Sequence, residues 1–408
     1  MHANNGKVIP AHTQLPLRLW EFVGIVASLM ALGAFAVDIM LPALGVIGET
    51  YKLSNANDQQ FVVYAYLVGF GIPQLFFGPL SDHYGRKNLL RICIIGYAVF
   101  SFGCMWTQTF TALLAARFVQ GLFSAGIRVI AMAIVRDVTS GPVMARIFSL
   151  VMTVFMVVPI IAPSIGQGVI SLVGWSWTFG VLGVLALMLL IWVHFRLPET
   201  LRAENKQPLG FVQSLQSFRL ILRTPVTFGY IAASGVIIGA LYAFLGASEQ
   251  IFHDVFDQGN RFAFWFAVVA ITLAGANFLN SRIVERFGMR KIGHCALIAF
   301  ILLALTNYIA MHTVGEKFIL FMPLFALMYG CFGMLGANFS ALAMEAHGRS
   351  VGSVSAAYGF ATTTVSSVFG YLVSNQFNGT VAPILFGFTA LGVVAFIIIL
   401  ITERGKLF

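Results

Sequence analysis

The sequence predicts an all-α membrane protein with about twelve transmembrane helices. Its 408 residues are 59% hydrophobic and only 10% charged, and the mean hydropathy of +0.89 is too high for an ordinary soluble protein. Apolar stretches of roughly 20 residues recur along the chain, and each can cross a bilayer core as a helix. These stretches lack the alternation of polar and apolar residues that a transmembrane β-barrel requires.

Hydropathy places the expected spans in order along the chain. They are 20–47, 58–80, 88–108, 110–135, 144–170, 175–195, 225–250, 260–282, 291–311, 317–344, 351–374 and 381–402. Residues 1–20 are polar and carry no cleavage site, so we expect a retained tail rather than a signal peptide. The four cysteines fall inside spans without metal-ligand spacing, and we interpret them as packing residues.

Basic residues are distributed unevenly among the expected loops. The formal net charge is +9, and if the N-terminus is cytoplasmic, 19 of the 24 Lys and Arg lie in cytoplasmic tails and loops. Three lie in outer loops and two inside a span. This asymmetry follows the positive-inside rule, so we expect both termini in the cytoplasm and a multi-pass protein of the bacterial inner membrane. It also accounts for the basic balance without a nucleic-acid partner.

The chain divides near its midpoint. Residues 196–224 form the longest polar interruption, and we expect a cytoplasmic linker there between two six-helix bundles, 1–195 and 225–408. An internal repeat supports this division, because DHYGRK in the first half matches ERFGMRK in the second, and Gly85 and Gly288 lie 203 residues apart. Both copies follow the second span of their half and precede the third.

The loop GPLSDHYGRKNLL, residues 78–90, is charged and marked by glycines. Glycines permit a tight reversal between helices, and basic residues hold a loop inside, which alone explains one such loop. The acid among the cations, Asp82 here and Glu285 in the second copy, indicates a breakable charge network between helix ends, with Asp137 as a partner of Arg86. The predicted cytoplasmic gate consists of Gly78, Asp82, Gly85, Arg86, Lys87, Arg136 and Asp137.

These motifs resemble those of the major facilitator superfamily. Residues 78–87 match every fixed position of its G-x-L-x-D-x-x-G-R-K signature, and residues 113–121 match L-x-x-x-R-x-x-Q-G on the fourth helix. With VDIMLPALGVI (37–47), IVRD (134–137) and LPETL (197–201), the chain most resembles the bicyclomycin/chloramphenicol-resistance (Bcr/CflA) branch of drug:proton antiporters. The resemblance implies two pseudo-symmetric bundles of the major facilitator fold and a proton as coupling ion.

The fifth span keeps part of the antiporter pattern of that family, G-x-x-x-G-P-x-x-G-G. The residues of this motif here are Pro159, Pro163 and Gly166. Val158 and Ala162 stand where the family has its first two glycines, and Gln167 stands at the last. This departure leaves symport open beside antiport.

Ionisable residues inside the membrane cost about 2.5–3.5 kcal/mol each on insertion scales, so each is a functional candidate. Asp38 lies in the first span, and loss of hydration in an apolar cavity favours a neutral carboxyl. We expect Asp38 to carry the coupled proton, unless it only pairs with a buried cation. The resemblance supports this role and implies that Arg117 braces the cavity and tunes a nearby carboxyl.

Two further charged residues leave alternatives open. Arg128 follows Arg117 by eleven residues, on the same helix face and about 16 Å along the axis. It either snorkels toward the cytoplasm or makes the cavity floor cationic, which would favour anionic or zwitterionic cargo. Glu249, at the outer end of the seventh span, either lines the cavity or lies in a wet outer vestibule.

Polar groups at mid-span complete the predicted cavity. Lipid cannot satisfy the hydroxyls of Tyr64 and Tyr66, so we expect at least one of them to face the cavity with Gln74. The predicted cavity consists of Asp38, Tyr64, Tyr66, Gln74, Arg117, Arg128, Glu249 and Asn277. With 39 Phe, 11 Tyr and 6 Trp in the chain, such a cavity suits bulky amphipathic compounds and loose specificity.

Common enzyme motifs are missing from the sequence. It has no G-x-x-x-x-G-K-[ST] phosphate loop, no nucleophile elbow and no metal-ligand spacing, so we expect no enzyme, no ATP-driven pump, no metal and no cofactor. We predict a monomeric, proton-coupled antiporter that exports small amphipathic compounds by alternating access. The alternative is a dedicated carrier of an endogenous metabolite, such as a siderophore, nucleoside or peptide. A membrane enzyme or sensor on a transporter fold would need a reactive constellation that the sequence does not offer.

Overall fold

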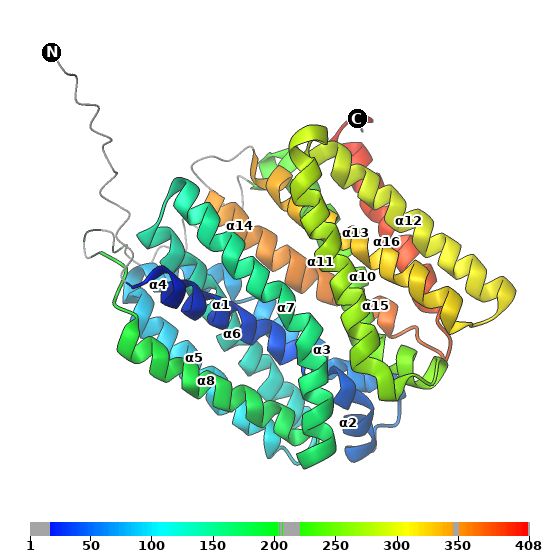
Figure 1. Cartoon of the computed structure of the whole chain (residues 1–408), viewed down its shortest axis with the longest axis horizontal. Helices are drawn as coiled ribbons and strands as arrows, with labels where there is room; N and C mark the ends of the chain where they lie inside the picture. The colour runs from blue at the N-terminus through cyan, green and yellow to red at the C-terminus, as the bar shows by residue number, and fades with distance from the viewer. Residues whose placement is uncertain (1–16, 203, 205, 207–220, 346–350, 407–408) are drawn as a thin grey trace.

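Helices account for every predicted span in the computed structural model (Figure 1). The structure describes residues 17–202, 204, 206, 221–345 and 351–406, and the predicted linker lies largely outside this part. The N-terminal helices, blue to green in Figure 1, form one bundle, and the C-terminal helices, yellow-green to red, form a second bundle beside it. The predicted all-α fold is therefore present.

The N-terminal bundle contains two broken spans. Its elements are α1 (Leu19–Asp38), η1 (Leu41–Ala43), α2 (Leu44–Thr50), η2 (Ala56–Gln60), α3 (Phe61–Gly71), α4 (Gln74–Tyr84), α5 (Arg86–Met105), α6 (Phe110–Val138), α7 (Gly141–Val173) and α8 (Ser176–Arg196). Proline cannot donate a backbone hydrogen bond, and it lies at both breaks. Pro42 follows the end of α1, and Pro73 separates α3 from α4, where the span bends by 45°.

The C-terminal bundle has its interruption in a different span. Its elements are α10 (Pro225–Gln250), η4 (Ile251–Val255), η5 (Gly259–Arg261), α11 (Phe262–Phe287), α12 (Met289–Val314), α13 (Phe318–Glu345), α14 (Val351–Phe360), η6 (Ala361–Val365), α15 (Ser366–Ser374) and α16 (Ala382–Thr402). The π-helical turn η6 joins α14 and α15 into one predicted span, 351–374. Such turns interrupt the regular hydrogen-bond ladder of a helix.

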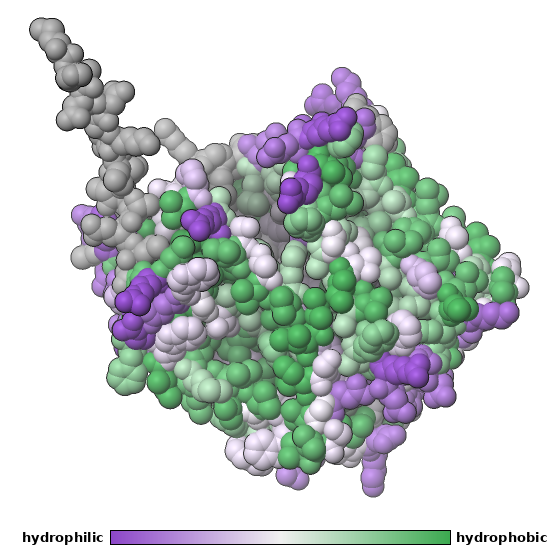
Figure 2. Space-filling model, viewed as in Figure 1, coloured by the Kyte–Doolittle hydropathy of each residue, from purple (hydrophilic) through white to green (hydrophobic). Residues whose placement is uncertain are grey.

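Length and composition qualify most of these helices as membrane spans. Within the described residues, ten helices are long and apolar enough to cross a bilayer, and the bent pair α3–α4 makes an eleventh. The twelfth predicted span is the interrupted one, 351–374, whose pieces are individually short. Figure 2 shows apolar side chains, in green, across the middle of the molecule and hydrophilic ones, in purple, toward its two ends. The chain is a multi-pass membrane protein.

The internal repeat has the same backbone geometry in both halves. Gly85 has φ 94° and ψ 150°, and Gly288 has φ 82° and ψ 152°. Each glycine ends one helix and begins the next, in a conformation that residues with a Cβ rarely adopt. The predicted correspondence between the two loops therefore holds at the level of backbone angles.

Helix α1 begins and helix α16 ends at the same end of the two bundles (Figure 1). We call this the terminal end and the other the opposite end. The two bundles meet along α7 and α11, which run side by side, and along α3 and α4 against η6 and α14. The core of the N-terminal bundle forms where α6 packs against α3 and α5, and where α7 packs against α1.

Candidate functional site

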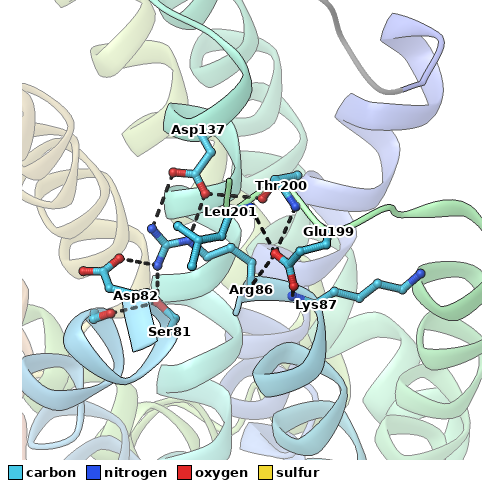
Figure 3. A network of polar contacts seen from close by, with 9 residues as sticks. Ser81, Asp82, Arg86, Lys87, Asp137, Glu199, Thr200 and Leu201 are labelled. Atoms are coloured by element: carbon cyan, nitrogen blue, oxygen red, sulfur yellow. Dashed lines mark hydrogen bonds and ion pairs between the residues drawn. The ribbon is translucent and has the colours of Figure 1, made fainter. Parts of the chain in front are cut away.

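Arg86 is the centre of an ion-pair network at the terminal end (Figure 3). Its guanidinium lies 2.6 Å from a carboxylate oxygen of Asp82 and 2.8 Å from one of Asp137, and it donates a 2.5 Å hydrogen bond to Ser81. Arg86 is only 6% exposed, so this charge is compensated almost entirely by protein groups. The network joins α4, α5 and α6, and the expected Arg86–Asp137 pair is present.

Glu199 adds a second anchor to this network, from the segment after α8 (Figure 3). Its Oε1 accepts a 3.0 Å hydrogen bond from the backbone N–H of Arg86, and its Oε2 accepts one of 3.1 Å from Lys87. These N–H groups lie in the first turn of α5 and have no acceptor within the helix itself, and the helix dipole favours an anion there. The hydroxyl of Thr200 also donates to Asp137, at 3.3 Å.

The C-terminal half has an equivalent network, but it does not run through the predicted acid. Arg290, near the start of α12, pairs with Glu345 at 3.3 Å and with Glu403 at 3.1 Å. Glu345 ends α13 and Glu403 follows α16, just as Asp137 lies in the last turn of α6 and Glu199 follows α8. Glu285 is exposed and forms no ion pair among the residues that the structure describes. The sequence repeat therefore identified the loop correctly and the acid incorrectly.

The remaining predicted gate residues lie around the Arg86 network. Gly78 has open space where a Cβ would stand, so its position needs no glycine on steric grounds. Arg136 is exposed, and it forms no ion pair in the described part of the chain. Lys87 takes part through its backbone N–H rather than its ammonium group. Their role as a gate stays a prediction.

Asp38 ends α1 at the break before η1. Its side chain is 5% exposed, and no described residue forms a hydrogen bond or ion pair with its carboxyl. On the neighbouring α7, Gly166 lies so close that a Cβ there would approach the carbonyl oxygen of Ile39 to 1.9 Å. Gly166 of the predicted motif therefore packs directly against the break that follows Asp38. Pro159 and Pro163 lie inside the same continuous helix.

Arg117 lies inside the N-terminal bundle and is fully buried. It donates to the carbonyl of Val62 at 3.1 Å and to Oε1 of Gln120 at 2.7 Å, and its guanidinium lies 4.5 Å from the ring centre of Tyr66. One of its terminal nitrogens is buried without a hydrogen bond. Arg117 therefore braces α3 against α6, and it contacts no carboxylate among the described residues.

The two tyrosines of α3 do not line an open cavity in this conformation, contrary to expectation. Tyr66 is 1% exposed and donates to the hydroxyl of Ser124, while Tyr64 is 4% exposed and shares a 2.7 Å hydrogen bond with Ser374. Protein groups thus satisfy both hydroxyls. Gln74 is also buried, and it donates to Thr363 of the other bundle.

Asn277, on α11, is the predicted cavity residue of the eighth span. It is half-buried, and its side chain forms no hydrogen bond among the described residues. Its neighbour Asn280 accepts a 2.7 Å hydrogen bond from Asn338 of α13. The buried amide pair of this region is therefore Asn280 with Asn338, which the sequence analysis did not identify.

Uncharged amides join the two bundles at the opposite end. Gln60 donates to Gln250 at 2.7 Å, Gln250 donates to Asn57 at 3.0 Å, and Asn57 donates to the carbonyl of Phe377 at 2.9 Å. Each of these amides is at most 8% exposed. Buried hydrogen bonds of this kind hold specific groups together because leaving one unmade is costly. We call Asn57, Gln60 and Gln250 the amide lock.

Glu249 lies beside the amide lock. Its carboxylate accepts a 3.2 Å hydrogen bond from Gln59, and it fills the space against Gly45, where a Cβ would lie 2.7 Å from Oε1. It is half-buried at the contact between α10 and the N-terminal bundle. In this conformation Glu249 therefore belongs to the contact between the bundles rather than to an open vestibule.

The positions of the hydrogen bonds between the two bundles show which end of the molecule is closed. Among described residues, hydrogen bonds that join the bundles occur only from Gln74, near mid-membrane, to the opposite end. The ion-pair networks of the terminal end each stay within one bundle. Figure 2 shows the surface hollowed between the bundles toward the terminal end. The molecule is closed at the opposite end.

Sequence reasoning missed the amide lock and the role of Glu199. Both had a signal: two glutamines lie at the start of the second predicted span, one ends the seventh, and Glu199 lies in the motif LPETL. Charged residues stand out in a membrane sequence, whereas the amides are neutral and Glu199 acts on backbone groups. The described residues contain no group of three or more His, Cys, Asp or Glu that could hold a metal ion.

Comparison with known proteins agrees with this architecture. Residues 24–371 match the Major Facilitator Superfamily. The chain is similar to the bicyclomycin resistance protein homolog of Haemophilus influenzae, with 29% identity over 92% of this chain and 94% of that protein. It is also similar to the chloramphenicol resistance protein CraA of Acinetobacter baumannii, with 24% identity over 84% of this chain and 80% of that one.

A solved structure shows the same fold. The crystal structure of a D-xylose-proton symporter has a TM-score of 0.72 at 14% identity, over 93% of this chain and 96% of that one. The family match and the relatives, together with this fold, identify a membrane transporter rather than an enzyme. The chain belongs to the major facilitator superfamily, and its relatives agree with the Bcr/CflA resemblance.

Proposed function

We propose that this protein is a proton-coupled antiporter that exports small amphipathic compounds. The observation that carries the proposal is Asp38, a buried membrane carboxyl at a helix break that has no partner among the described residues. Such a carboxyl can gain and lose a proton within the transport cycle, because no ion pair fixes its charge. The names of the two resistance proteins support drugs as cargo.

The cycle would work by competition between proton and substrate. A proton on Asp38 and a substrate in the space between the bundles disfavour each other, and opening alternates between the two ends. Moving one charge through ~100 mV supplies about 2.3 kcal/mol. A difference of one pH unit adds about 1.4 kcal/mol. Together these would sustain a gradient of several hundred-fold, which is sufficient for resistance without ATP.

The proposed orientation places the terminal end in the cytoplasm of a bacterial inner membrane. The 19-to-3 distribution of basic residues supports it. The conformation closed at the opposite end is then the one that receives substrate from the cytoplasm. In this orientation the Arg86 network is the cytoplasmic gate and the amide lock is the outer gate. We propose that one chain carries out this cycle as a monomer.

A dedicated carrier of one endogenous metabolite is the second candidate. The unpaired Arg128 favours it, because a fixed cation selects cargo by charge, whereas an apolar cavity does not. This candidate predicts that a single class of compounds moves protons.

Proton movement in inverted membrane vesicles tests the proposal. A pH-sensitive dye would follow protons while cationic, neutral and anionic amphipathic compounds are added to wild type, Asp38→Asn and Asp257→Asn. Asp257 is an exposed carboxylate at the opposite end with φ 52°, a backbone conformation that asparagine tolerates. We expect several unrelated compounds to move protons in wild type and Asp257→Asn and none in Asp38→Asn. Proton movement retained in Asp38→Asn would refute the role of this carboxyl.

A further inference from the structure

Arg128 lies on α6 between the two bundles, about 15 Å from the terminal end of that helix at 1.5 Å per residue. Its guanidinium lies 5.6 Å from the ring centre of Phe70. Tyr66 of the same bundle and Tyr242 of the other lie within electrostatic range. The half-buried side chain of Arg128 therefore lies on the side of α6 that faces the other bundle rather than lipid.

No carboxylate of the described residues reaches this cation. Arg128 forms no hydrogen bond or ion pair in the described structure. Most acids of the terminal end are engaged elsewhere: Glu21 with Arg196, Asp82 and Asp137 with Arg86, and Glu345 and Glu403 with Arg290. Glu199 binds backbone N–H groups of α5, and Glu285 is exposed on α11 of the other bundle. Contact with an aromatic ring compensates a buried cation only in part. A charge at this depth without a partner among the described residues indicates that the transported compound supplies one.

Asp38 lies too far along the bundle to be the counter-ion of Arg128. Tyr66 bonds to both Gly33 of α1 and Ser124 of α6, which places these residues at one height. Counting 1.5 Å per residue from this height, Asp38 lies about 7.5 Å toward the opposite end and Arg128 about 6 Å toward the terminal end. The two unpaired charges are thus about 13 Å apart along the axis. A substrate that arrives from the terminal end meets Arg128 first.

We infer that Arg128 binds the anionic group of the substrate and that the preferred cargo is therefore an amphipathic organic anion with an aromatic or apolar body. This inference rests on the proposed export function and names its substrate class. A preference for anions still admits compounds with unrelated apolar bodies, which separates this exporter from a carrier of one metabolite. A guanidinium binds a carboxylate or phosphonate through two parallel hydrogen bonds, and the nearby rings of Phe70 and Tyr242 suit an aromatic body. The same cation repels lipophilic ammonium compounds, which selects against them.

Binding of three matched probes tests the inference without any transport assay. The probes are 2-naphthoate, 2-naphthamide and (2-naphthylmethyl)ammonium, which share one ring system and differ in charge. Titration calorimetry would measure their binding to purified wild type, Arg128→Gln, Arg128→Lys and Arg146→Gln. Arg146 is an exposed cation at the start of α7, so its replacement removes one positive charge away from the space between the bundles.

We expect wild type and Arg146→Gln to bind naphthoate at least about tenfold more tightly than the other two probes. Arg128→Gln should lose this preference by weakening naphthoate alone, and Arg128→Lys, which keeps the charge, should retain part of it. Wild type that fails to bind naphthoate or prefers the ammonium probe overturns the inference. So does an unchanged preference in Arg128→Gln. Because binding is measured directly, a preference for naphthoate without coupled proton movement would uphold this inference while refuting the proposed function.

Discussion

At the scale of single residues, Glu199 acts on the start of α5 through backbone N–H groups rather than through an ion pair. Its two oxygens accept from Arg86 and Lys87, and Oε1 also accepts from Thr200 and Leu201. One carboxylate thus connects the segment after α8 to the first turn of α5 and holds Arg86 where Asp82 and Asp137 reach it. Sequence reasoning could pair Arg86 with Asp137 by charge, but an acid that binds backbone groups has no charged partner to reveal it.

Replacing Glu199 with alanine should therefore destabilise the protein. Loss of a capping acceptor costs about 0.5–2 kcal/mol, so the unfolding temperature of purified Glu199→Ala should fall below that of wild type. Glu204→Ala is the matched control, because among the described residues Glu204 pairs only with Arg202, at 3.6 Å, and its side chain is 72% exposed. Equal unfolding temperatures for the two variants, measured in the same detergent, would contradict the capping role.

At the scale of elements, α7 packs directly against the break between α1 and η1. The backbone of Gly166 contacts the carbonyl of Ile39, the residue after Asp38, and small residues allow membrane helices to approach this closely. The sequence analysis named Gly166 from a motif resemblance, but it could not show what the glycine contacts. That contact is between residues far apart in sequence, and only the packed structure contains it.

Gly166→Ala should slow transport by at least about tenfold, because the added methyl must push α7 away from the break that positions Asp38. Gly168 lies two residues further along the same helix, and a Cβ there has no neighbour within 4 Å. Gly168→Ala should therefore transport at the wild-type rate. Rates would be measured in vesicles and divided by the amount of inserted protein. Equal rates for the two variants would mean that the close approach at Gly166 does not matter for transport.

At the scale of the whole molecule, the two ends are held by different chemistry. Ion pairs hold the terminal end within each bundle, and neutral amides hold the opposite end across the two bundles. The spans, the repeat at Gly85 and Gly288, and the Arg86–Asp137 pair could be predicted, because hydropathy, glycine and charge leave local signals. Which end is closed could not be predicted, because one sequence must support both conformations of an alternating-access cycle. The amides that close this end are also neutral, so they leave no charge pattern in the sequence.

The central claim is that Asp38 couples substrate movement to protons without being needed to carry substrate. Purified wild type, Asp38→Asn and Asp257→Asn would be reconstituted into liposomes, and uptake of a labelled substrate would be measured with an imposed pH gradient and, separately, as exchange at equal pH. We predict that Asp38→Asn loses accumulation driven by the gradient but keeps exchange, while Asp257→Asn matches wild type in both. Gradient-driven accumulation by Asp38→Asn at the wild-type level would contradict the account.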